Sequence, residues 1–152
     1  MIVQQKRGRE SMITKKQRTY FDIARKISEL SDHPQYKIGC AVVLGHRIIS
    51  SSCNSNTKTH PMQKKYNRYR FPVDQGNHML HAEVRALLPL LNSKIDLSRA
   101  EIYTYRVHKN GKLALSKPCD GCRELIKSCG ICTIGYTTDD GFVVENREDY
   151  MH

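Results

Sequence analysis

Apolar side chains recur at helical spacing in parts of the chain, and the spacing predicts amphipathic helices. Thr14 and Gln17 form a T-x-x-Q capping box at the start of the first helix, and Pro34 stops it. We expect Pro89 to kink or end the second helix. Pro118 suits the first position of the third. The predicted helices cover residues 15–31, 80–91 and 118–130.

Apolar and partly β-branched runs between these helices predict strands, and turn residues separate some of them. Gly45 and His46 suit a two-residue turn of type II′, and Asn110-Gly111 marks another turn. After residue 137 the pattern of apolar and polar residues is weak, although the segment could supply one more element. The predicted strands cover residues 38–44, 47–53, 100–107 and 131–137. This order of helices and strands indicates the α/β class, with one sheet and helices packed on its faces.

Residues 54–79 are polar, basic and aromatic without a regular period, which predicts a long loop of the kind that often carries function. Within it, residues 57–71 interleave basic and aromatic side chains, a pattern suited to phosphate contact and base stacking. Lys58 is our candidate substrate contact in this segment. The alternative is a solvated loop whose aromatic side chains pack into the core.

The chain has 152 residues and a formal net charge of +10, from 25 Lys and Arg against 15 Asp and Glu. The charge is uneven, since residues 33–73 contain no acidic side chain. Such an excess favours an anionic partner, either a nucleotide phosphate or a nucleic acid backbone. A solvated face that keeps the protein soluble would look the same.

The length fits one domain, so we expect a basic, flexible arm over residues 1–13 and a single domain over residues 14–152. No run approaches the roughly 18 apolar residues of a transmembrane helix, and no apolar segment near the N-terminus predicts a secretory signal. We therefore expect a cytoplasmic protein without membrane contact.

The six cysteines include two C-x-x-C pairs, which in a reducing compartment indicate metal or redox chemistry. The pair Cys119 and Cys122 follows Pro118 at a predicted helix start, and His81 precedes another helix. Unpaired N–H groups and the positive end of the helix dipole favour the thiolates that zinc requires. Three such ligands leave a fourth position for water, as in catalytic zinc sites, and Glu83 could take the proton of that water.

The motifs His81-Ala82-Glu83 and Pro118-Cys119-Asp120-Gly121-Cys122 together resemble those of the cytidine and deoxycytidylate deaminase superfamily. A strand–hairpin–strand followed by Asn54 extends the resemblance to about residues 15–137. It implies a three-layer α-β-α fold, in which a five-stranded mixed sheet carries helices on both faces. It also implies a reaction that replaces an exocyclic amine by a carbonyl and releases ammonia, and a homo-oligomeric state.

The resemblance also assigns roles to single residues. It implies Zn²⁺ as the cofactor, Glu83 as the proton shuttle, a base contact from the backbone N–H of Ala82, and a sugar contact from Asn54. Tyr136, near the end of the last clear strand, is a further candidate for the pocket, although it could equally be a core residue. The implied zinc ligands are His81, Cys119 and Cys122.

The substrate stays open among several classes. We favour conversion of dCMP to dUMP, because the domain is compact and basic residues are available for one phosphate. The alternatives are a polynucleotide, either cytosine in single-stranded DNA or adenosine in tRNA, and free cytidine. A non-catalytic zinc-stabilised nucleic-acid-binding module is the alternative from a different class, and Glu83 argues against it.

Other metal sites are also conceivable. His60 and His78 flank the polar excursion and could bind a second metal or a phosphate, although histidines in loops more often have no binding role. Cys129 and Cys132 could join Cys119 and Cys122 in a structural four-cysteine site. We expect instead that they fill space in the core, as free cysteines often do.

Overall fold

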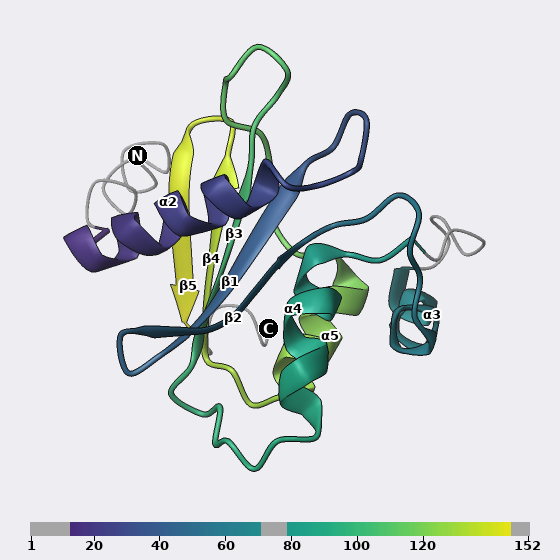
Figure 1. The fold of residues 1–152 in the computed structure, drawn as a ribbon. Helices are drawn as coiled ribbons and strands as arrows, with labels where there is room; N and C mark the ends of the chain where they lie inside the picture. Colours follow the sequence, from purple (N-terminus) through teal and green to yellow (C-terminus); the bar gives the residue numbers. More distant parts are fainter. Residues whose placement is uncertain (1–12, 71–78, 147–152) are drawn as a thin grey trace.

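The structure, a computed structural model, describes residues 13–70 and 79–146. At its centre lies a five-stranded sheet in the order β2-β1-β3-β4-β5 (Figure 1). Strands β3 and β4 run parallel and the other neighbours antiparallel, so the sheet is mixed. The strands are β1 (Ile38–Leu44), β2 (Arg47–Cys53), β3 (Glu101–Arg106), β4 (Thr133–Thr138) and β5 (Gly141–Asn146).

Helix α2 (Lys15–Ser28) covers one face of the sheet (Figure 1). It begins at the predicted capping box, in which Thr14 Oγ1 accepts a hydrogen bond from Gln17 N at 3.0 Å and Gln17 Oε1 accepts one from Thr14 N at 2.9 Å. Its fully buried Phe21 meets Tyr103 of β3 edge to face, with ring centroids 5.0 Å apart. Aromatic packing therefore fixes α2 on the sheet.

Two glycines allow this close packing. A Cβ on Gly39 would lie 1.9 Å from the carbonyl oxygen of Ala24 and 2.5 Å from the amide nitrogen of Ser28. A Cβ on Gly135 would lie 2.4 Å from the ring of Tyr103. Both contacts are far shorter than van der Waals distances. At Gly39 the colliding atoms are α2 backbone, so only glycine lets this helix approach the sheet so closely, whereas Gly135 makes room for the Tyr103 ring of the next strand.

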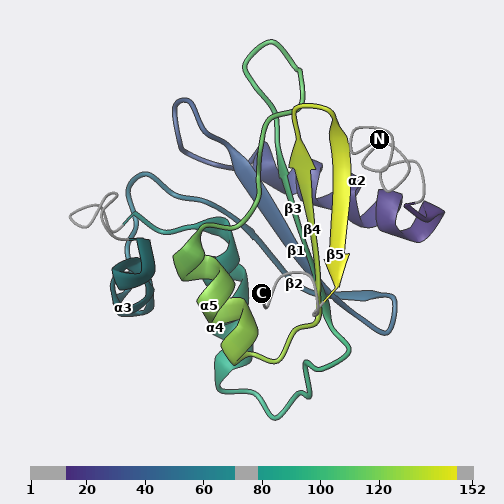
Figure 2. The ribbon, with the colours of Figure 1, turned by 180° about the vertical axis from the view of Figure 1, so that it is seen from behind.

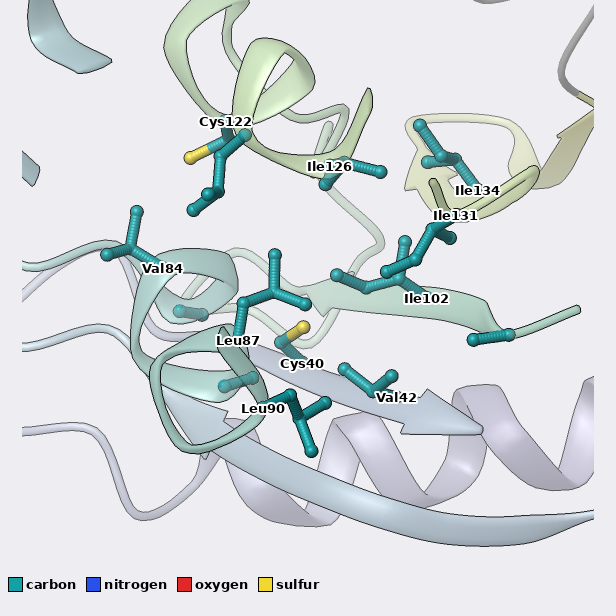
Figure 3. Close-up of a cluster of buried hydrophobic side chains, with 14 of the residues drawn as sticks. Cys40, Val42, Val84, Leu87, Leu90, Ile102, Cys122, Ile126, Ile131 and Ile134 are labelled. Atoms are coloured by element: carbon teal, nitrogen blue, oxygen red, sulfur yellow. The ribbon is translucent and has the colours of Figure 1, made fainter. Parts of the chain in front are cut away.

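Helices α4 (Ala82–Leu91) and α5 (Asp120–Ser128) cover the opposite face (Figure 2). Between them and the sheet lies the larger apolar core, which Figure 3 shows. Leu87 of α4 and Ile126 of α5 are fully buried there, together with Cys40 of β1 and Ile102 of β3. The two helical layers around the sheet confirm the predicted three-layer α-β-α fold.

The excursion after β2 contains structure that the sequence pattern did not predict. Helix α3 (Pro61–Asn67) and a 3-10 turn η1 (Arg68–Arg70) lie within the predicted loop. Helix α3 is too short to show a clear hydrophobic period, although Pro61 at its first position is a known start signal. His60 is its N-cap, and His60 Nδ1 accepts a hydrogen bond from Met62 N at 3.0 Å. The loop prediction was therefore wrong for residues 61–70.

Several element boundaries also differ from the predictions. Helix α2 ends at Ser28 rather than at residue 31. Helix α5 begins at Asp120, so Pro118 precedes the helix instead of opening it, while α4 continues past Pro89 to its end. Gly45 and His46 have φ values of 58° and 67°, and two positive values indicate a type I′ turn rather than type II′. Helix α5 ends at Ser128 rather than at residue 130, and Gly130, with a φ of 81°, lies just after its C-cap Cys129.

Within the described ranges, none of the helices has the length and apolar character that a membrane span requires. The predicted N-terminal arm lies outside the described residues except for Ile13.

Replacing Gly39 by alanine should destabilise the protein by about 1–3 kcal/mol, because the new methyl group would collide with α2 backbone atoms that cannot rotate away. Urea unfolding would measure the loss. Ser51→Ala on the exposed edge strand is the control and should change the stability by less than about 0.5 kcal/mol. Equal stability of Gly39→Ala and wild type would contradict the close packing of α2.

Candidate zinc and substrate site

The predicted zinc ligands lie at the N-termini of two helices. His81 is the N-cap of α4 and Cys119 the N-cap of α5, while Cys122 lies in the first turn of α5. Neither N-cap side chain makes a capping hydrogen bond to its own helix. His81 Nδ1 instead lies 3.3 Å from Cys122 Sγ and 3.6 Å from Cys119 Sγ.

The donor set of this cluster fits zinc. One imidazole nitrogen and two sulfurs lie within 4.8 Å of one another, and this is the one such group of His, Cys, Asp and Glu found over residues 13–70 and 79–146. A hydrogen bond with Cys122, helped by His81, lowers the pKa of the Cys119 thiol to about 4. The same hydrogen bond, together with burial, raises the pKa of Cys122 well above its usual range. The site thus already favours one thiolate ligand.

Glu83 lies beside these ligands in the first turn of α4 and is only 5% exposed. Burial raises the pKa of its carboxyl, an effect that the charge of His81 partly opposes. The side chain lines the same cavity as His81 and Cys119. A buried carboxyl with a raised pKa in a cavity is suited to accept and return a proton.

The cavity has a volume of about 430 Å³, which is in the range of small-molecule sites. Glu83 is the one acidic residue among the described residues that line it. Two of the other predicted site residues, Ala82 and Asn54, also line it. Ala82 is fully buried and is the first residue of α4.

The side chain of Asn54 is largely occupied by its own protein. Its Oδ1 accepts hydrogen bonds from Ile38 N at 3.0 Å and Ser31 Oγ at 2.7 Å, and its Nδ2 donates to Tyr36 O at 2.5 Å. These bonds tie the segment before β1 to the end of β2. They leave one N–H of the amide for a ligand, so Asn54 could still donate one hydrogen bond to a sugar oxygen. The sugar contact stays a prediction.

Two other candidate residues are not brought into the cavity. Lys58 is exposed and does not line it. Tyr136 is a core residue whose hydroxyl donates to Glu145 Oε1 at 2.5 Å. Of the two histidines proposed for a second metal, His60 caps α3 and His78 lies outside the described residues.

Several residues that line the cavity were not identified from the sequence. Arg106 ends β3, Lys117 precedes the Pro-Cys motif, and His33 and Tyr36 lie in the segment before β1. The position of Arg106 at a strand end was a usable signal, but a single arginine carries little information alone. His33 Nδ1 accepts hydrogen bonds from two backbone N–H groups, so its Nε2 carries the ring hydrogen.

Asp32 shapes the rim next to Asn54. Its carboxylate accepts hydrogen bonds from Asn56 N at 2.7 Å, Thr57 Oγ1 at 2.8 Å and Ser55 Oγ at 3.0 Å. These bonds, that from Asn56 first, hold the pKa of Asp32 below its usual range. Asp32 thereby holds Ser55 and Asn56, which line the cavity, in place.

Comparisons with known proteins agree with this geometry. Residues 14–138 match the model of the family described as the cytidine and deoxycytidylate deaminase zinc-binding region. The chain belongs to this family. It is therefore a zinc-dependent hydrolytic deaminase that acts on cytosine compounds, and the non-catalytic zinc module considered from the sequence is not supported.

Solved structures of deaminases share the fold. The dCMP deaminase of cyanophage S-TIM5 matches with a TM-score of 0.58 and 21% identity over 82% of this chain and 84% of its own. Cytidine deaminase from Burkholderia pseudomallei matches with a TM-score of 0.59 and 19% identity over 91% and 96%. The enzyme from Mycobacterium leprae matches with a TM-score of 0.51 and 18% identity over 84% and 92%. A search of curated proteins gave no match.

Replacing Cys119 or Cys122 by alanine should strongly reduce the zinc content, because each change removes one of three protein ligands. Elemental analysis after dialysis would measure it. Cys129→Ala and Cys132→Ala are the controls and should keep the zinc, since neither residue belongs to the cluster. Loss of zinc from either control would instead support the four-cysteine site.

Proposed function

We propose that the protein converts dCMP to dUMP with release of ammonia. One observation carries the choice of a nucleotide: the cavity that holds Glu83 also holds the cationic side chains of Arg106 and Lys117. A cytosine ring at Glu83 and a 5′-phosphate at these cations would use both parts of the cavity. A nucleoside would leave the cations without an anionic partner.

Arg106 is well placed for such a contact. Its guanidinium carbon lies 4.7 Å from the centre of the Tyr36 ring, and its Nη1 donates to Leu115 O at 3.3 Å. Its Nε is buried and has no hydrogen-bond partner among the described residues. The ring and the carbonyl hold the guanidinium in place, and the remaining N–H groups are available for phosphate oxygens.

The chemistry follows from the zinc ligands and Glu83. Zinc held by His81, Cys119 and Cys122 supplies a Lewis acid that makes a water a usable nucleophile at neutral pH. Glu83 takes one proton from the water and gives it to the neighbouring ring nitrogen as the C–O bond forms. It then takes the proton of the new hydroxyl and gives it to the amine, so that the carbonyl forms, the C–N bond breaks and ammonia leaves. The N–H of Ala82 would hold the base in register.

A structure of the S-TIM5 enzyme holds dCMP and dUMP and shares the fold, with a TM-score of 0.57, which supports the proposal at the level of the fold. The basic residue predicted for the phosphate from the sequence was Lys58, and the proposal now assigns this role to Arg106 and Lys117. A homo-oligomer and a cytoplasmic location remain predictions from the sequence.

A polynucleotide is the second candidate substrate, favoured by the surface of α3 and η1. Lys65 Nζ lies 5.5 Å from the Tyr66 ring centre, and the Arg68 guanidinium carbon lies 4.9 Å from that of Tyr69. The two rings stack with centres 5.9 Å apart. Cations beside aromatic rings suit single-stranded nucleic acid. None of these residues lines the cavity, so the mononucleotide comes first.

Product analysis by mass spectrometry tests the proposal. Zinc-loaded protein is offered dCMP, deoxycytidine and a short single-stranded DNA with one cytosine. We expect dUMP from dCMP, and a loss of about 10²–10⁴-fold in rate for Glu83→Ala, with zinc and fold retained, because the proton shuttle is gone. Deamination of the oligonucleotide alone would overturn the dCMP proposal, and loss of zinc from Glu83→Ala would make Glu83 structural.

Arg106→Gln should lower kcat/KM for dCMP by about 10–100-fold, the value of a hydrogen bond between charged groups, and leave kcat/KM for deoxycytidine nearly unchanged. Steady-state kinetics with both substrates would show this. Lys58→Gln removes one positive charge outside the cavity and should have little effect on either substrate. An equal loss for both substrates in Arg106→Gln would mean that Arg106 supports the fold of the site rather than the phosphate.

A further inference from the structure

Helix α3 reaches the zinc site through one buried side chain. Gln63 is only 1% exposed, and its Oε1 accepts a hydrogen bond from the backbone N–H of the zinc ligand His81 at 2.9 Å. The amide orientation is settled by this contact, because a backbone N–H can only meet the oxygen. The other end of the amide, Nε2, donates to Asn67 Oδ1 at 2.8 Å, one turn further along α3.

The same hydrogen bond occurs elsewhere in the chain in its usual form. At the start of α2, the N–H of the N-cap Thr14 donates at 2.9 Å to the side chain of Gln17, three residues later in the same helix. This is one half of a capping box. In α4 the N-cap is His81, and the residue three positions later is Val84, which has no acceptor. Gln63 supplies the missing acceptor from another helix.

The other half of the capping box is absent from α4 as well. His81 makes no side-chain capping bond, and its Nδ1 faces Cys119 and Cys122 instead. A zinc ligand at the N-cap therefore cannot perform the usual capping role with its side chain. With Val84 in the first turn, nothing within α4 would fix the peptide plane that precedes His81.

Gln63 is itself held in place. His60 caps α3, and Gln63 N donates to His60 O at 2.9 Å. The chain on both sides of the excursion is paired, since Leu80 N donates to Lys58 O at 3.0 Å. Residues 58–63 thus form a short, hydrogen-bonded connection from the end of the sheet to His81.

We propose that Gln63 is a positioning residue for zinc binding: it completes the N-terminal cap of α4 from α3 and so fixes the backbone of His81 while leaving the imidazole free for the metal. It touches neither the substrate nor the ligand atoms. The role is the same whichever cytosine compound the cavity accepts. Outer contacts of this kind commonly change metal affinity by about 10–100-fold.

Competition with a chromophoric zinc chelator, followed on the full chain, tests this role without any assay of activity. Gln63→Met keeps the length and the apolar stem but removes the acceptor, and we expect its zinc affinity to fall at least about 10-fold. Gln63→Glu keeps an oxygen acceptor and should stay within about threefold of wild type, because protonated or not it can accept from His81 N. Tyr66→Phe is the matched control on the same helix, since it removes a hydroxyl that bonds Ser128 Oγ at 3.3 Å, and it should keep the wild-type affinity.

Thermal unfolding of the zinc-free variants separates positioning from general stability. A lower melting temperature of Gln63→Met with unchanged zinc affinity would overturn the proposal, because the contact would then only stabilise the fold. If Gln63→Met does not fold, Gln63→Asn decides, since it stays polar but withdraws the acceptor by one methylene. Wild-type zinc affinity of Gln63→Asn would equally overturn the proposal, and reduced affinity would support it.

Discussion

The zinc site depends on two helices that begin at one point and give their N-cap residues to the metal. A helix start offers unpaired N–H groups and a positive potential, which favour the thiolate form of a cysteine ligand. The same position normally needs its side chain for capping, and His81 and Cys119 do not provide it. At the start of α4 the surrounding chain supplies a substitute, since Gln63 of α3 accepts the hydrogen bond of His81 N.

The sheet sets the distance between the two helix starts. Strands β3 and β4 are parallel neighbours, so the chain must cross over between them, and α5 makes this crossover. Helix α4 precedes β3 and packs on the same face. With both helices held against one apolar core, their N-termini meet at the same edge of the sheet. Helix α2 lies on the other face, where Gly39 lets it pack closely on the sheet, and none of its residues lines the cavity.

The sequence predicted that His81, Cys119 and Cys122 would form one cluster, because their motifs are short-range and their residue types are rare, and the structure brings the three together. The role of Glu83 stays a prediction. The strands β1 and β2 were also predicted with the observed bounds, since β1 is a compact apolar run and β2 follows it after a two-residue turn. Helix α3 was missed because its apolar contacts, Met62 and Tyr66, span a single turn and give no readable period.

The side chains of the cavity were harder to predict than its ligands. Arg106 comes from β3 and Tyr36 from the segment before β1, so their contact joins parts of the chain that are far apart in sequence. Lys58 has the charge and the sequence position expected of a phosphate contact, yet in the fold its side chain lies on the exposed surface. Long-range geometry decides such cases, and local pattern does not contain it.

An isolated antiparallel bridge between Thr59 and Met79 closes the excursion into a loop. Its two ends are fixed beside each other. The number of residues between the two ends therefore has little effect on the cost of holding these ends together. The part from residue 58 to residue 67 has no such freedom, because it holds the backbone of a metal ligand. One excursion thus combines a segment open to variation with a segment bound to the chemistry, and the border between them falls after α3.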